Sequence, residues 1–195
     1  VGEAGTDVIT HLRNMLPDQS KASLIANDGD VIKKVSDEQI SRIPSTSTHL
    51  IISVGGNDAI MNADILNLEM GTSAEVLSEI SGRQKIFEND YTEMLESLTK
   101  IGLPVGVCTV YNPNFDDPST QKIAETALCA FNDSVIRKAS EYGLPILDLR
   151  LICSEKDDYA NDIEPSEKGG EKIAKNIAEL VNKHDFDSNR PSIYF

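Results

Sequence analysis

The sequence contains no apolar run close to the roughly 20 residues that a membrane-spanning helix needs, so we expect no bilayer crossing. Basic residues are also scarce, because 18 Lys and Arg stand against 32 Asp and Glu, for a formal net charge of -14. An acidic surface of this kind repels phosphate backbones and anionic lipid headgroups. Nucleic-acid and membrane partners are therefore excluded from the expected functions.

Cysteine is nearly absent as well, and the chain has only Cys108, Cys129 and Cys153. Three is an odd number, and no CxxC pair or other metal-type spacing occurs, which argues against a disulfide framework and a zinc site. Reduced thiols indicate a cytoplasmic compartment, and no charged and apolar signal region follows Val1. We expect neither a metal nor another cofactor.

What is present is typical of one globular domain spanning residues 1–195, with 39% hydrophobic and 26% charged residues. Short apolar runs followed by turn residues predict four buried parallel strands, at 22–27, 49–54, 104–110 and 145–149. Helical periodicity covers 8–16, 31–43, 59–66, 74–101, 118–142 and 166–183, with Gly82 as a candidate break. This alternation predicts a three-layer α/β/α sandwich with a mainly parallel sheet.

Ligands of such sheets bind beyond the carboxyl ends of the strands, where the stretch SVGGNDA at 53–59 leaves the second strand. Gly55 and Gly56 allow a sharp turn, and Asn57 offers an NH2 group that can stabilise a developing oxyanion. A plain turn in which Asp58 caps the next helix is the alternative. Residues leaving the first strand could reach the same point, and Gly29 could present its backbone N–H there.

These blocks resemble the SGNH hydrolase superfamily, the GDSL esterases and lipases, from about Val8 to Val181. The resemblance implies the flavodoxin-like fold of that family and hydrolysis of an acyl ester or an O-acetyl group in a small-molecule substrate. Gly29 falls on the family's oxyanion glycine, and the stretch from Gly55 to Asp58, with Gly56 and Asn57, falls on its GxND block.

Two features depart from the family pattern. The family's first, central strand ends in GDS and supplies the nucleophilic Ser, but no GDS occurs here, so we expect that strand to precede Val1. The family's final DxxHP block falls on residues 161–165, where Asn161 replaces the Asp and Glu164 replaces the His. Without a nucleophilic Ser and a His base, we expect the chain alone to be nearly inert toward simple esters.

The resemblance makes Asn161 and Glu164 the candidate catalytic pair. Glu164 could act as the base in a desolvated pocket, where carboxylates hold protons more tightly, or it could only bind backbone N–H groups at the start of the helix from Ser166. The three histidines, His11, His49 and His184, are expected away from the site.

Three functions therefore remain open at this stage. The first is a GDSL-like ester hydrolase, and the second is a noncatalytic protein of the same fold that binds a small acyl or sugar ligand. The third is an acidic module that binds Mg2+ or Ca2+. Its ligands would come from Asp28, Asp30, Asp58, Asp148 and Glu164.

Overall fold

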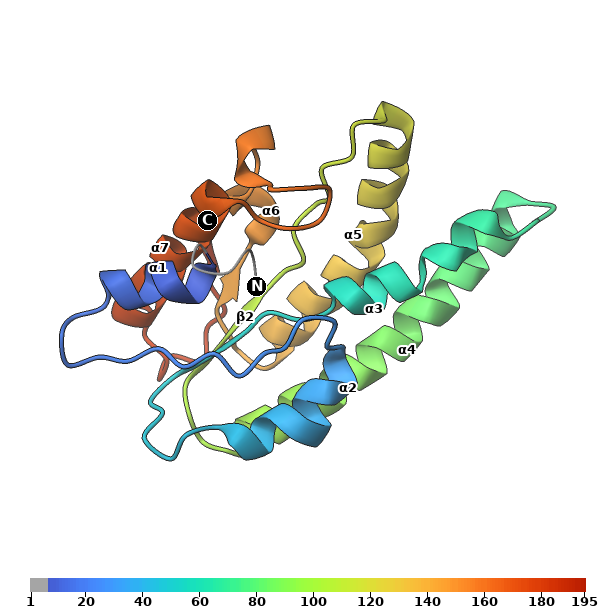
Figure 1. Cartoon of the computed structure of the whole chain (residues 1–195). Coiled ribbons are helices and arrows are strands. Elements are labelled where there is room, and N and C mark those ends of the chain that lie inside the picture. Colours follow the sequence, from blue (N-terminus) through green and yellow to red (C-terminus); the bar gives the residue numbers. More distant parts are fainter. Residues whose placement is uncertain (1–6) are drawn as a thin grey trace.

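The structure is a computed structural model that describes residues 7–195, and it contains a parallel four-stranded sheet between two layers of helices (Figure 1). The strand order is β1-β2-β3-β4, and each neighbouring pair is parallel. The strands are β1 Leu50–Ile52, β2 Val105–Cys108, β3 Ile146–Leu147 and β4 Ile193–Tyr194. The α-helices are α1 Val8–Met15, α2 Ile32–Lys34, α3 Gly56–Met61, α4 Ser73–Thr99, α5 Pro118–Glu141, α6 Leu149–Ile152 and α7 Glu167–Lys183. Shorter or irregular helical turns are η1 Val35–Gln39, η2 Ile40–Arg42, η3 Ala63–Asn67 and η4 Lys156–Asp158.

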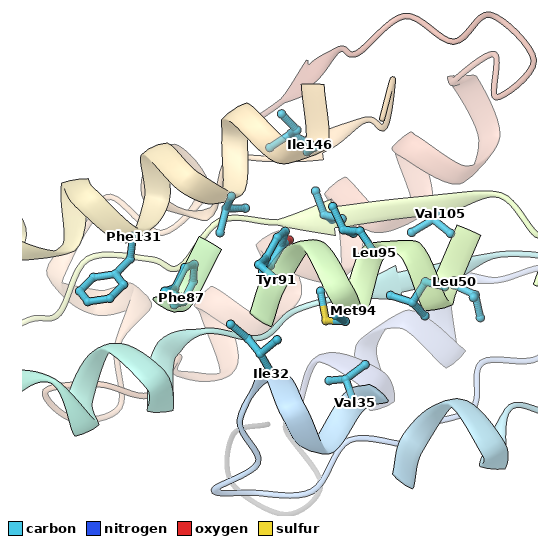
Figure 2. Packing of buried hydrophobic residues seen from close by; sticks show 14 of the residues in the cluster. Ile32, Val35, Leu50, Phe87, Tyr91, Met94, Leu95, Val105, Phe131 and Ile146 are labelled. Carbon is cyan, nitrogen blue, oxygen red and sulfur yellow. The ribbon is translucent and has the colours of Figure 1, made fainter. Parts of the chain in front are cut away.

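The two faces of the sheet bury their side chains against different helices, as the alternation of side chains along a strand requires. Val105 and Val107 of β2 belong to a core cluster with α4 and α5. Figure 2 shows this cluster, in which Tyr91 and Leu95 of α4 lie against the sheet. Cys108 of β2 belongs instead to a second cluster with α6 and α7, which confirms the three-layer arrangement.

Three of the four predicted strands are confirmed, with shorter bounds, as β1, β2 and β3. The strand predicted at 22–27 is wrong, since these residues form no strand and Leu24 keeps 45% of its surface exposed. An apolar run becomes a strand only when a neighbour completes its hydrogen bonds. Among residues 7–195, β1 pairs with β2 on one side and with no strand on the other.

Two further details differ from the sequence-based expectation. Strand β4 was not predicted, because a pair of residues is too short to show a periodic pattern; it pairs in parallel with β3 through Ile146 and Ile193. Helix α4 also runs without a break through Gly82. A capping box of Thr72 and Glu75 at its start and its packing against α5 offset the cost of about 1 kcal/mol for one glycine.

All three cysteines are free thiols in the structure. Cys108 and Cys153 are buried, and burial raises the pKa of each thiol to about 12, so both are inert as nucleophiles at neutral pH. Within residues 7–195, no helix is both long enough and apolar enough to span a membrane.

Candidate active site

A cavity of about 420 Å³ lies beyond the carboxyl ends of β1 and β2, within the usual size range of small-molecule sites. Gly29, Gly56, Asn57 and Glu164 all line this cavity. They come from three segments far apart in the sequence, namely the loop before α2, the start of α3 and the loop before α7. The structure therefore places four of the six expected site residues around one space.

A hydrogen bond joins the first two of these segments, because Asn57 Nδ2 donates to the backbone oxygen of Asp30 at 2.9 Å. Gly29 and Gly55 have φ angles of 80° and 114°, a left-handed conformation that side chains other than glycine rarely adopt. A Cβ on Gly55 would also lie 3.1 Å from the ring of Phe87. The two glycines thus let both segments approach the cavity closely.

Asp58 does not line the cavity, in contrast to the expected ligand-binding role. Its carboxylate accepts a hydrogen bond from the backbone nitrogen of Ile32, at 3.2 Å to Oδ2, and so ties α3 to the start of α2. It is not the cap of its own helix either, because the residue at that position is Gly55. Burial raises the pKa of Asp58 above its ordinary value, which is the expected cost of this structural role.

Asn161 holds the half-buried Glu164 through a local set of hydrogen bonds. Asn161 Nδ2 donates to Glu164 Oε2 at 2.6 Å, and Asn161 Oδ1 accepts from the backbone nitrogens of Ile163 and Glu164. Asn161 is itself exposed and does not line the cavity. The side chain that caps α7 is Ser166, whose Oγ accepts from the nitrogen of Gly169, so Glu164 does not serve as the cap.

Two hydrogen bonds fasten the loop that carries Glu164 to the loop after β2. Tyr111 Oη donates to the backbone oxygen of Ile163 at 2.7 Å, and the nitrogen of Asn114 donates to the oxygen of Asp162 at 2.7 Å. Tyr111 also lines the cavity, and burial raises its pKa to about 12, so its hydroxyl stays a donor at neutral pH. Tyr111 was not expected as a site residue, although its position directly after a buried strand was the available signal.

A buried polar network supports the strand ends below the cavity. Asp148 accepts from Arg150 Nε at 2.8 Å and from Arg150 Nη2 at 2.6 Å, and it also accepts from the hydroxyl of Thr109 at 3.0 Å. The same hydroxyl accepts from the nitrogen of Leu149. Burial acts to raise the pKa of Asp148, but the bonds from Arg150 and Thr109 outweigh it and the pKa is lowered.

Neither a metal centre nor a histidine base is found at this site. Within residues 7–195, no group of three or more His, Cys, Asp or Glu side chains could hold a metal ion, so the structure gives the acidic metal-binding alternative no support. None of the three histidines lines the cavity. His184 lies at the end of α7, next to Phe186 and Tyr194, and burial lowers its pKa.

The apolar part of the cavity was missed entirely by reasoning from the sequence. Helices α4 and α5 and the η3 turn supply this wall. Its main members are Ile65, Leu66, Ile80, Leu128 and Phe131. Their periodicity is the same as that of ordinary core residues, so only the packing of the helices shows that they face a cavity.

Comparison with solved structures assigns the fold. The chain superposes on an extracellular lipase from Streptomyces rimosus with a TM-score of 0.64 and 15% identity, covering 93% of this chain and 87% of the lipase. A lipolytic protein of the G-D-S-L family from Veillonella parvula gives a TM-score of 0.67 and 12% identity, with coverages of 93% and 91%. An acetyl xylan esterase gives 0.63 and 17%, with coverages of 92% and 96%.

The chain therefore has the SGNH hydrolase fold, the fold of the GDSL lipases and esterases. At such low identities the likeness establishes the fold and not the reaction. No family model matches the sequence, and no curated protein matches it either.

Proposed function

We propose that this protein is an ester hydrolase of the SGNH type with an altered catalytic block. The observation that carries the proposal is the convergence of Gly29, Asn57 and Glu164 on one cavity at the carboxyl ends of the strands. The resemblance gives Gly29 and Asn57 the role of oxyanion donors. Glu164 then takes the place of the histidine base, with Asn161 as the residue that positions it.

The hydrogen bonds around Glu164 support this assignment of roles. A general base needs a partner that fixes its orientation, and Asn161 supplies one by donating to Glu164 Oε2 at 2.6 Å. Tyr111 holds the same loop through its hydrogen bond to the backbone oxygen of Ile163. This arrangement leaves Glu164 Oε1 without a hydrogen bond among the described residues, so that oxygen is available to accept a proton.

The second candidate is a noncatalytic protein of the same fold that binds a small acyl or sugar ligand in the same cavity. Two observations favour this candidate. No histidine lines the cavity, and Asn161 and Glu164 replace the Asp and the His of the family's catalytic pair. In this case Asn161 would only fix Glu164, which lines the cavity, and neither residue would take part in a reaction.

Replacement of Glu164 by Gln separates the two candidates. The assay is hydrolysis of a short-chain nitrophenyl ester by a form of the protein that carries a nucleophilic serine, because no GDS occurs in these 195 residues. If Glu164 is the base, Glu164→Gln abolishes turnover, since the amide cannot take a proton. Glu167→Gln is the matched control, because Glu167 is exposed three residues further on and does not line the cavity.

A double substitution that restores the residues of the family provides a second check on the role of Glu164 as the base. Glu164→His together with Asn161→Asp restores the pair of the family, and we expect turnover to increase. Full activity of Glu164→Gln would refute the role of Glu164 as base. Absence of any turnover by the natural protein, combined with ligand binding in the cavity, would favour the noncatalytic candidate.

A further inference from the structure

The cavity has two chemically different ends. Gly29, Asn57, Tyr111 and Glu164 supply the polar end beside the strands. The opposite end lies between α4 and α5, whose N-terminal halves diverge (Figure 1). The edge-to-face contact of Phe87 and Phe131, with ring centroids 5.0 Å apart, marks where the two helices come together.

The polar side chains at the far end of the cavity are already paired within the protein. Arg83 forms ion pairs with Asp64 and with Glu79, so it is not free to hold an anionic headgroup. Asn62 Nδ2 uses one of its two hydrogens in a bond to the oxygen of Asp58 at 2.8 Å, and Thr120 Oγ1 donates its hydrogen to Asp117 at 2.8 Å. A sugar bound at this end would find few free partners for its hydroxyl groups, which is costly.

The size of the cavity and the exposed apolar side chains at its rim also favour an apolar ligand at this end. A space of about 420 Å³ is far larger than an acetyl group requires. Ile60 and Leu66 line the mouth with 51% and 56% of their surfaces exposed. A ligand that covers them would remove apolar surface from water, which is favourable.

We infer that the space between α4 and α5 binds an aliphatic acyl chain, so that the substrates are medium- or long-chain acyl esters rather than acetylated sugars. The inference rests on the proposed function and deepens it, since the ester carbonyl would then lie at the polar end, near Asn57 and Gly29. The chain would pass Phe131, which contacts the Phe87 ring beside Gly55, and would then extend along Leu128 and Ile80 between the diverging helices.

Binding of neutral alcohols tests the inference without any need for hydrolysis. Isothermal titration calorimetry compares butanol, hexanol, octanol and decanol, with xylose as the polar counterpart. Each buried methylene group strengthens hydrophobic binding about fourfold, and neighbouring alcohols of the series differ by two methylene groups. We therefore expect the affinity to rise about fifteenfold from one alcohol to the next until the cavity is filled. Xylose is expected not to bind at this end.

Filling the cavity should remove this dependence on chain length. Ala127→Trp and Ala124→Trp place a large ring on the α5 wall, and the second variant covers the case in which the first does not fold. Ala178→Trp is the matched control, because Ala178 is also half-buried, but it lies on α7 away from the cavity. The control should bind octanol as the natural protein does, whereas both α5 variants should lose the binding.

The outcomes separate this inference from the proposed function. Alcohol binding that strengthens with chain length and is lost in Ala127→Trp supports the inference, even if the protein cleaves no ester. An affinity that does not depend on chain length, or that both α5 variants retain, overturns it. Cleavage of nitrophenyl acetate at a higher kcat/KM than nitrophenyl octanoate would also overturn it while leaving the proposed function in place.

Discussion

Asn57→Ala provides a quantitative test of the oxyanion assignment, because the side chain has two separable tasks. Its Nδ2 carries two hydrogens, and one of them is used in the 2.9 Å hydrogen bond to the oxygen of Asp30. The second is available to a ligand in the cavity that Asn57 lines. Truncation to alanine removes both.

The two losses differ in size. Removing the bond to Asp30 costs the fold about 1 kcal/mol, since water can reach the half-buried oxygen that is left. Removing one oxyanion donor lowers kcat about a hundredfold to a thousandfold, which corresponds to about 2.7 to 4 kcal/mol. We therefore expect the loss of activity to exceed the loss of stability by a clear margin.

The assay combines steady-state hydrolysis of a nitrophenyl ester with urea unfolding of the same samples. Asn176→Ala is the control, because Asn176 Nδ2 donates to the backbone oxygen of Lys172 at 3.0 Å on α7, far from the cavity. Both variants should lose similar stability, but only Asn57→Ala should lose turnover. A kcat above about a tenth of the natural value in Asn57→Ala would refute the assignment of Asn57 as an oxyanion donor.

Two further predictions concern the supports of the site. Tyr111→Phe removes the hydrogen bond to the oxygen of Ile163 and should lower stability by about 1 kcal/mol. Because the loop of Glu164 loosens, kcat should fall by about tenfold or more with little change in KM, and unchanged kcat would contradict the positioning role. Arg150→Met leaves the buried carboxylate of Asp148 unpaired and should cost about 3 kcal/mol at pH 7, measured by urea unfolding. The pKa of Asp148 is lowered in the fold, so the ionised carboxylate stabilises the protein above the ordinary aspartate pKa, and this stabilisation is lost in acid. The difference in free energy of unfolding between the natural protein and Arg150→Met should therefore shrink below about pH 4.

Part of the placement of the site could be predicted from a simple rule of parallel sheets. Residues that follow buried strands emerge at one edge, and this rule placed Asn57 after β1 at the carboxyl edge. Gly29 was expected there after a strand at 22–27 that does not form, and Glu164 was expected there from the resemblance to the family's final block. The structure places all three around one cavity. The resemblance to the SGNH hydrolases supplied the chemical roles, which remain predictions.

Other parts of the site depend on tertiary contacts that no local pattern encodes. Asp58 looks like a ligand-binding residue or a cap in the motif, yet its partner is the backbone nitrogen of Ile32. Ile80 and Leu128 become one wall only through the angle between α4 and α5. The apolar run at 22–27 forms no strand because pairing with a neighbour, rather than composition, decides whether a strand forms.

The central claim is that Gly29, Asn57 and Glu164 surround the reaction centre of an ester hydrolase. Its most direct test is hydrolysis of a nitrophenyl ester by the 195-residue chain, measured beside any form of the protein that also carries a GDS serine. A form with that serine should turn over in a manner that depends on Asn57 and Glu164, whereas the chain alone should exceed the reaction in water by about ten thousandfold at most. Strong turnover by the chain alone, unchanged by Asn57→Ala and by Glu164→Gln, would contradict the claim and would place the active site elsewhere.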